Sequence, residues 1–327
     1  MSASKDNSTA PGVGYWSRYW AAASPHSLSG SFDQGYGGAI SAFWNGVAEA
    51  LPPRASVLDL ATGNAPLPRL LLEHRPDLLI HAVDAADITL TWRPSPPAAA
   101  PVIHARVSCE HLPFADADFD LVSSQYGIEY SDLDRSIAEV SRVLRPGGRF
   151  AAVIHTRDSR ISGVTADELG HVEVLLAPAA ALDAVAALAP FMAMAGTEEG
   201  RQELDSLPSA RVARNQFNAI AVALKQRSDH ALAPDILRDF LQWAPQVFSH
   251  ARQTGTAQPA LQSCQQYRQQ LADAKERYRS QQAAALDQKG QMRLLELMES
   301  QGLNLESRQI LIHDGHELGM ALTATRG

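Results

Sequence analysis

The sequence contains little cysteine and no run of lysine and arginine. Its two cysteines, Cys109 and Cys264, lie far apart, so they indicate neither a disulfide framework nor a metal-binding spacing. A reducing cytoplasm is the simplest compartment for such a chain. The net charge is −8, and positive charge is not clustered. Binding to nucleic acid or to an anionic membrane surface is therefore not expected.

Long apolar runs are also scarce. Residues 1–12 are polar and lack the apolar core of a signal peptide. The most apolar stretch, residues 174–195, is rich in alanine and is interrupted by Pro178, Asp183 and Pro190. It predicts a buried, broken helix rather than a membrane span. The hydrophobic fraction of 45% still allows a sizeable core.

Short apolar segments alternate with amphipathic ones between Ala55 and His155. The apolar segments predict strands at residues 55–60, 79–84, 102–107, 119–124 and 149–155. The amphipathic segments predict helices at 66–74 and 133–144. Strands and helices in this order predict a parallel sheet with right-handed crossovers.

Helix signals dominate residues 157–286, and the sheet pattern then returns, with a helix at 292–300 and strands at 307–313 and 318–325. We therefore expect an α/β fold, a Rossmann-like sheet of seven strands with a large helical insertion between the fifth and sixth strands. The expected divisions are a tail with an aromatic helical lid (1–50), a ligand-binding sheet domain (51–156 and 287–327) and the insertion (157–286). One helix of the insertion carries an apolar stripe, formed by Leu261, Cys264, Leu271, Ala274 and Tyr278. Such a stripe suits a cap over the site or a homodimer interface.

The turn after the first expected strand favours a ligand that contains ribose but no phosphate. It runs from Asp59 to Pro68, and Asp84 ends the second strand, where a carboxylate can accept hydrogen bonds from ribose hydroxyls. A dinucleotide would need G-x-G-x-x-G and free N–H groups at the helix start. Here two glycine positions are alanine, and Pro66 and Pro68 each remove a donor. The carboxylates suit a cationic ligand.

Four motifs in order resemble the class I S-adenosylmethionine-dependent methyltransferases. VLDLATGNA resembles their first motif and VDAAD their acidic second motif. CEHLPFADADFDLV and EVSRVLRPGGRF are similar to the ubiquinone/menaquinone-biosynthesis type, called methyltransferase type 11. The resemblance covers about 100 residues and implies S-adenosylmethionine as the cofactor.

The resemblance also implies roles for single residues. The turn with Asp59, Ala61 and Gly63 should face the methionine part of the cofactor, and Asp84 should hold its ribose. The segment Ser108-Cys109-Glu110 should flank the adenine, although the family usually has Asp at the position of Ser108. Three neighbours complete the expected cofactor-binding set: Asn64, Ala85 and Gln125. Glycine is common in the family at Ala61 and Ala65.

The loop from Gln125 to Tyr130 should lie beside the transferred methyl group. It lacks the Asn/Asp-Pro-Pro-aromatic motif of DNA amino-methyltransferases, which disfavours nucleic-acid bases as substrates. Tyr126 can position the acceptor, and Glu129 or His155 can take its proton. Alternatively, Glu129 is an exposed loop carboxylate and His155 a structural histidine, with transfer driven by orientation alone.

Aromatic residues crowd the N-terminal segment. They are Tyr15, Trp16, Tyr19, Trp20, Phe32, Tyr36, Phe43 and Trp44. Their rings can pack the acceptor or the sulfonium, or they can simply pack a helix. Asp116, Asp118 and Asp120 are read as a loop cap and strand start, and no metal is expected.

The sequence thus predicts a methyltransferase that acts on oxygen, nitrogen or carbon of a small molecule. Two rivals remain open. One is a methyltransferase for protein or peptide side chains, and the other is a methyltransferase-like regulatory or binding protein without catalysis.

Overall fold

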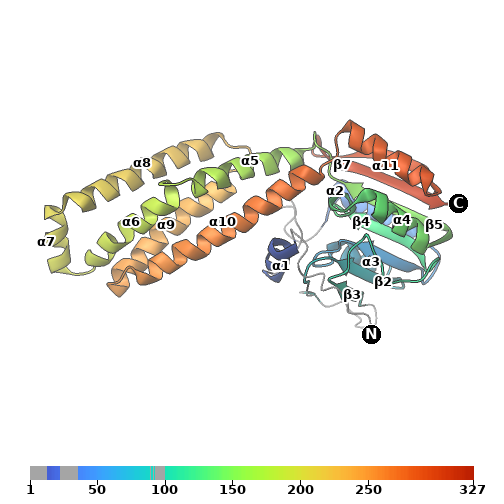
Figure 1. Ribbon diagram of the computed structural model, residues 1–327, viewed down its shortest axis with the longest axis horizontal. Coiled ribbons are helices and arrows are strands. Elements are labelled where there is room, and N and C mark those ends of the chain that lie inside the picture. The colour runs from blue at the N-terminus through green and yellow to red at the C-terminus, as the bar shows by residue number, and fades with distance from the viewer. Residues whose placement is uncertain (1–12, 23–35, 89, 91, 93–99) are drawn as a thin grey trace. The chain divides into compact units, whose positions relative to one another are not determined.

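The computed structural model describes residues 13–22, 36–88, 90, 92 and 100–327 (Figure 1). Contacts divide the chain into a sheet unit, residues 1–163 and 280–327, and a helical unit, residues 164–279. The helical unit is shorter at both ends than the expected insertion at 157–286. The difference arises because the beginning of α5 and the end of α10 make their contacts with the sheet unit.

Seven strands form one sheet in the order β3-β2-β1-β4-β5-β7-β6. The strands are β1 (Ser56–Leu60), β2 (Leu79–Asp84), β3 (Val102–Ala105), β4 (Phe119–Gln125), β5 (Leu144–Ile154), β6 (Leu303–His313) and β7 (His316–Arg326). The first five are parallel, and β7 runs antiparallel to both β5 and β6. This sheet confirms the predicted fold class, including a helical insertion between β5 and β6.

Several strand boundaries differ from the sequence prediction; β6, for example, begins at Leu303 rather than Ser307, and β7 at His316 rather than Leu318. β5 begins at Leu144 rather than Arg149, because Leu144 pairs with Phe119 before the register shifts at an irregularity. The predicted strand at 102–107 ends at Ala105, and Arg106 then turns into a left-handed conformation with φ of 61°.

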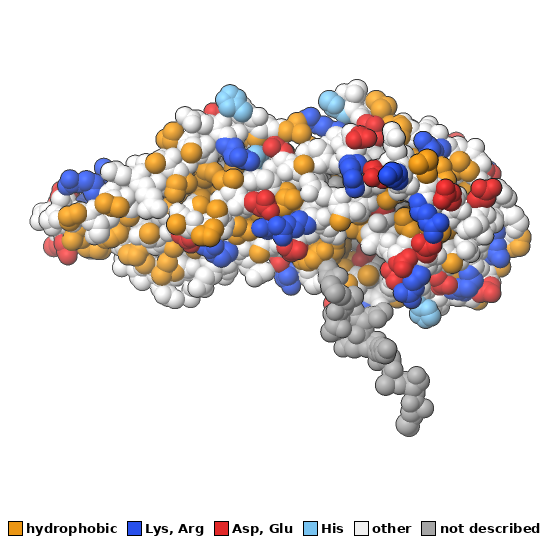
Figure 2. Space-filling model, turned by 45° about the horizontal axis from the view of Figure 1, so that its top comes forward, with side chains coloured by type: hydrophobic (Ala, Val, Ile, Leu, Met, Phe, Trp, Pro, Cys, Tyr) orange, Lys and Arg blue, Asp and Glu red, His pale blue; other side chains and the backbone are white. Residues whose placement is uncertain are grey.

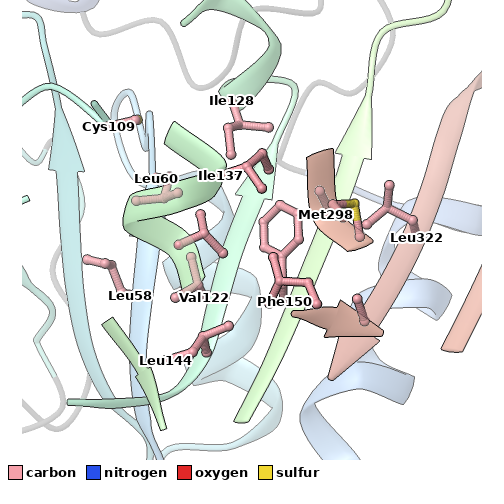
Figure 3. Packing of buried hydrophobic residues seen from close by; sticks show 14 of the residues in the cluster. Leu58, Leu60, Cys109, Val122, Ile128, Ile137, Leu144, Phe150, Met298 and Leu322 are labelled. Carbon is pink, nitrogen blue, oxygen red and sulfur yellow. The ribbon is translucent and has the colours of Figure 1, made fainter. Parts of the chain in front are cut away.

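Helices cover both faces of the sheet. Those of the sheet unit are α1 (Val13–Ala21), α2 (Gly38–Glu49), α3 (Pro66–His74), α4 (Leu133–Val143), α11 (Gln288–Ser300) and the 3-10 turn η3 (Ile128–Tyr130). One core cluster contains Ile40 and Trp44 of α2 with Leu71 of α3. The opposite cluster contains Ile137 of α4, and Figure 3 shows Phe150 and Met298 in the same layer.

The helical unit has its own core. Its helices are α5 (Arg160–Leu176), α6 (Ala181–Met194), α7 (Glu198–Ser206), α8 (Pro208–His230), α9 (Asp235–Thr254) and α10 (Gln258–Ala284), of which α5 and α10 cross the boundary. The apolar stretch at 174–195 covers the end of α5 and all of α6, and its Leu182 and Val185 are buried. Within the described residues, no single helix is long and apolar enough to cross a membrane. The pair α5–α6 reaches that length and composition, with a bend of 42°.

The two chain connections of the insertion lie side by side at the end of β5. The Leu286 N–H donates to the His155 carbonyl (2.9 Å), and the Arg157 N–H donates to the Leu286 carbonyl (3.1 Å).

On the face of the molecule in Figure 2, Lys and Arg side chains alternate with Asp and Glu instead of gathering into a patch of one sign.

Candidate active site

A cavity of about 570 Å³ lies at the carboxyl ends of β1, β2 and β4. This edge of a doubly wound parallel sheet is where ligands bind. Nine of the thirteen predicted site residues line the cavity: Asp59, Ala61, Asp84, Ala85, Ser108, Cys109, Glu110, Gln125 and Tyr126. The other four, Gly63, Asn64, Glu129 and His155, are not among its described lining residues.

The turn after β1 has a left-handed backbone at three positions. Ala61, Gly63 and Ala65 have φ of 51°, 54° and 57°. A Cβ at Gly63 would meet the Trp20 ring at 2.6 Å, so only glycine fits there. Glycine adopts this left-handed conformation at little cost, whereas alanine is strained in it. This is the physical reason why glycine was expected at the two alanine positions.

Asp84 is buried, and both of its carboxylate oxygens hold the turn. Its Oδ2 accepts the Gly63 N–H and its Oδ1 accepts the Ala86 N–H, each at 2.8 Å. Burial raises the pKa of Asp84 to about 6, against the lowering effect of these two hydrogen bonds. Each carboxylate oxygen can accept more than one hydrogen bond, so Asp84 can still accept hydrogen bonds from ribose hydroxyls.

Asp59 is a second buried carboxyl group at the cavity. Its Oδ1 accepts a hydrogen bond from the Ser123 hydroxyl on β4 (2.8 Å). Burial raises the pKa of Asp59 to about 7, and the nearby charge of Asp84 adds to this rise. Two carboxyl groups that ionise with difficulty favour a ligand whose positive charge would stabilise their anions.

The segment from Ser108 to Glu110 forms another wall of the cavity. Cys109 is buried, and burial raises the pKa of its thiol to about 12, so the thiol is uncharged. Glu110 accepts from Arg135 Nη1 (3.0 Å) and from the Asp132 N–H (3.0 Å). Glu110 is therefore held in place before any ligand arrives.

Helix α1 presents aromatic rings to the cavity. Trp16 and Trp20 both line it, with their rings stacked at 5.8 Å and 17°. Trp16 also meets the edge of Tyr130 at 5.8 Å and 84°. Asn64 Nδ2 donates to the Trp20 carbonyl (3.1 Å), which ties the helix to the turn after β1. Phe32 lies outside the described residues.

The two predicted proton acceptors lie beneath the cavity wall. His155 is fully buried, burial lowers its pKa to about 3, and neither ring nitrogen has a hydrogen-bond partner among the described residues. Glu129 is buried rather than exposed; its Oε1 accepts the His155 N–H (2.8 Å), and burial raises its pKa to about 7. Tyr126, whose ring stacks on His155, stands on the cavity side.

Sequence reasoning did not assign three residues that shape the site. They are Tyr36 and Arg135, which line the cavity, and Trp44, which donates to Gln125. The sequence indicated Tyr36 and Trp44 only as two of the aromatic residues in the N-terminal segment and gave neither a specific role. The salt bridge of Arg135 to Glu110 had no local signal, because 25 residues separate the two.

Two of the three clustered aspartates, Asp116 and Asp120, make local hydrogen bonds. Asp116 accepts from Arg142 (2.8 Å), and Asp120 accepts from Arg145 (2.6 Å) and from the Ser56 N–H (2.8 Å). Over residues 13–22, 36–88, 90, 92 and 100–327, no group of three or more side chains is arranged to hold a metal ion.

Comparison with known proteins finds similarity in the segment that contributes most of the cavity residues. Residues 58–152 match the family model described as "Methyltransferase domain". The chain is 37% identical over 108 residues to malonyl-[acyl-carrier protein] O-methyltransferase from Methylococcus capsulatus. The aligned region covers 32% of this chain and 39% of that protein. It is 32% identical over 108 residues to demethylmenaquinone methyltransferase from Thermus thermophilus, and this aligned region covers 32% of this chain and 48% of that protein.

These matches span less than half the length of either relative. Among solved structures, geranyl diphosphate methyltransferase in complex with GPP and sinefungin aligns with a TM-score of 0.43 and 10% identity, over 88% of this chain and 77% of that one. The family match, by contrast, runs from β1 to β5, through the cavity residues. Residues 58–152 are therefore similar to the family model described as "Methyltransferase domain", and this segment contains most of the residues that line the cavity.

Proposed function

We propose that this protein transfers a methyl group from S-adenosylmethionine to a small organic acceptor. The single observation that carries the proposal is the cavity at the ends of β1, β2 and β4, which is lined by both Asp59 and Asp84 and by the rings of Trp16 and Trp20. S-adenosylmethionine would supply a methyl group on a positively charged sulfur. The carboxylates suit its charge and its ribose, and the ring faces attract a cation.

The chain's own residues would hold the reactants and exclude water. Asp84, at the end of β2, would hold the ribose while it also braces the turn after β1, and Ser108 and Cys109 would flank the adenine. Tyr126, Tyr130 and Trp16 would orient the acceptor against the methyl group. Orientation and exclusion of water can provide much of the acceleration of a displacement reaction.

A general base is not part of the proposal. The imidazole of His155 and the carboxyl of Glu129 lie behind the described residues that line the cavity. The acceptor would then present a lone pair or an acidic proton of its own. A small molecule is favoured over a protein side chain because the similar proteins include demethylmenaquinone methyltransferase, which is named for a small-molecule acceptor.

Calorimetric titration tests the cofactor. S-adenosylhomocysteine should bind and NAD should not. Affinity for S-adenosylmethionine should rise between pH 5.5 and 8, because Asp59 and Asp84, with pKa values of about 7 and 6, must be ionised to attract its charge. Absence of binding at any pH would overturn the proposal.

Radioactive methyl transfer tests the acceptor. The full chain is incubated with S-adenosylmethionine labelled on the methyl group and with cell extract separated into small molecules and proteins. The proposal expects label in the small-molecule fraction. Label in the protein fraction would support a protein acceptor, and binding without transfer would support a regulatory protein.

A further inference from the structure

Gln125 brings a hydrogen-bond donor without a partner to the edge of the cavity. It is the last residue of β4, lines the cavity and is only 7% exposed. Its Nε2 has no hydrogen-bond partner anywhere in the described part of the chain. A buried polar group in this state is unfavourable, so a ligand atom that accepts its hydrogen would bind more tightly.

Trp44 determines which way the Gln125 amide points. The indole Nε1–H of Trp44 donates to Gln125 Oε1 (2.5 Å). An indole N–H can only donate, so a flipped amide would set two donors against each other. Trp44 is fully buried in the cluster beneath α2, which fixes its ring. Trp44 therefore keeps the oxygen of Gln125 occupied and leaves Nε2 for another partner.

The neighbouring strand indicates which chemical group would complement this donor. Asp59 on β1 pairs with Ser123 on β4, and Gln125 lies two residues further along β4, on the same face of the sheet. The face thus carries an acidic group beside an amide donor. An α-amino acid group, with an ammonium and a carboxylate, complements that pair.

We propose that Trp44 is a positioning residue that orients Gln125, whose Nε2 donates to the carboxylate of the amino-acid end of S-adenosylmethionine. The inference rests on the proposed function, since it takes the same ligand. It assigns to Gln125 recognition of one chemical group, separate from the ribose contact of Asp84 and from the ring faces of α1.

Two probes isolate that group. S-adenosylhomocysteine and its decarboxylated derivative differ only in the carboxylate, and neither needs turnover. Calorimetry measures both with the full chain and with the variants Gln125→Glu and Trp44→Phe. Gln125→Glu keeps an oxygen for the Trp44 N–H but replaces the Nε2 donor with a charged oxygen. Trp44→Phe keeps an aromatic ring at this buried position but removes the orienting N–H together with the rest of the pyrrole part of the indole.

Gln125→Glu should weaken binding of S-adenosylhomocysteine about tenfold to hundredfold, as expected for loss of a charge-assisted hydrogen bond. Binding of the decarboxylated probe should not weaken in this way, because it lacks the carboxylate that the new charge repels and keeps the ammonium that the charge attracts. Trp44→Phe should show the same selectivity with a smaller loss, about threefold to tenfold, because the donor remains but is no longer oriented. Phe43→Leu, at the adjacent position of α2, is the matched control and should show no selectivity between the probes.

Equal weakening of both probes, or of neither, would overturn the inference. If Gln125→Glu fails to fold, the ratio of the two affinities in Trp44→Phe decides the question alone. An oxygen supplied by the acceptor instead would leave both affinities unchanged in both variants. Failure of the wild-type chain to bind either probe would refute the proposed function rather than this assignment.

Discussion

The imidazole of His155 stacks against the phenol ring of Tyr126, with 4.3 Å between the ring centroids and 12° between the planes. The Tyr126 hydroxyl donates to the Leu318 carbonyl (3.0 Å), which fixes the ring. Tyr126 lines the cavity and His155 does not. A histidine at the end of a parallel strand is here a buried support for the tyrosine that lines the cavity.

Replacement of His155 by Phe should therefore lower kcat less than tenfold. Phe preserves the stack with Tyr126 and removes two buried nitrogens without partners, whereas loss of a general base costs about 10²–10⁴-fold. The measurement is the rate of S-adenosylhomocysteine formation with the acceptor fraction of cell extract. A drop of more than a hundredfold with unchanged cofactor affinity would restore His155 to the role of base.

Replacement of Glu129 by Gln should stabilise the protein more at pH 8 than at pH 5. The folded pKa of Glu129, about 7, is raised by burial, so its protonated form favours folding. That contribution is complete below the ordinary pKa of about 4.5 and is lost as pH rises through 7. Gln can accept the same His155 N–H at all pH values. The gain at pH 8 should be up to roughly 3 kcal/mol, from urea unfolding at both pH values. A gain that does not depend on pH would contradict the prediction.

Asp84→Ala should destabilise the protein even without ligand. The change leaves the Gly63 and Ala86 N–H groups without their acceptor, at a cost of about 1–3 kcal/mol each. Binding of S-adenosylhomocysteine should weaken as well. Chemical denaturation and calorimetry measure the two effects separately. Asp118→Ala, an exposed carboxylate in the loop before β4, is the control and should change neither. Full stability of Asp84→Ala would show that the turn does not need this carboxylate.

Ala61→Gly should be neutral or stabilising, by up to about 1 kcal/mol, because φ of 51° strains an L-residue. The comparison is Ala82→Gly on β2, a fully buried position outside the left-handed residues. That change should cost about 1–2 kcal/mol, through lost methyl burial and backbone entropy. Thermal unfolding of both variants measures the contrast. Equal destabilisation would argue against strain at Ala61.

Excision of the insertion should leave a sheet unit that binds S-adenosylhomocysteine. Arg157 and Leu286 are hydrogen-bonded neighbours, so a short Gly/Ser linker can join the chain there without moving β5. Turnover should be lost if the helices form a cap over the acceptor. Calorimetry and the methyl-transfer assay follow the two properties. Normal turnover by the shortened chain would rule out a cap.

The sequence by itself determined the sheet and the part of the cavity that contains Asp59 and Asp84. Strand periodicity located β1, β2 and β4 within a residue of their observed ends, and the turn and Asp84 followed directly from them. These features depend on contacts between residues near in sequence and on the fixed geometry of parallel strands. That is why Asp59, Ala61 and Asp84 fall together at one sheet edge, as predicted from their positions alone.

Only the tertiary structure decided what lies behind the cavity wall. No local pattern distinguishes an exposed Glu129 from one buried against the His155 N–H, or a catalytic imidazole from one stacked beneath Tyr126. The orientation of Gln125 depends on Trp44, 81 residues earlier. Burial and hydrogen-bond direction arise when distant segments pack, and they determine whether a polar group meets a ligand, a proton or only another side chain.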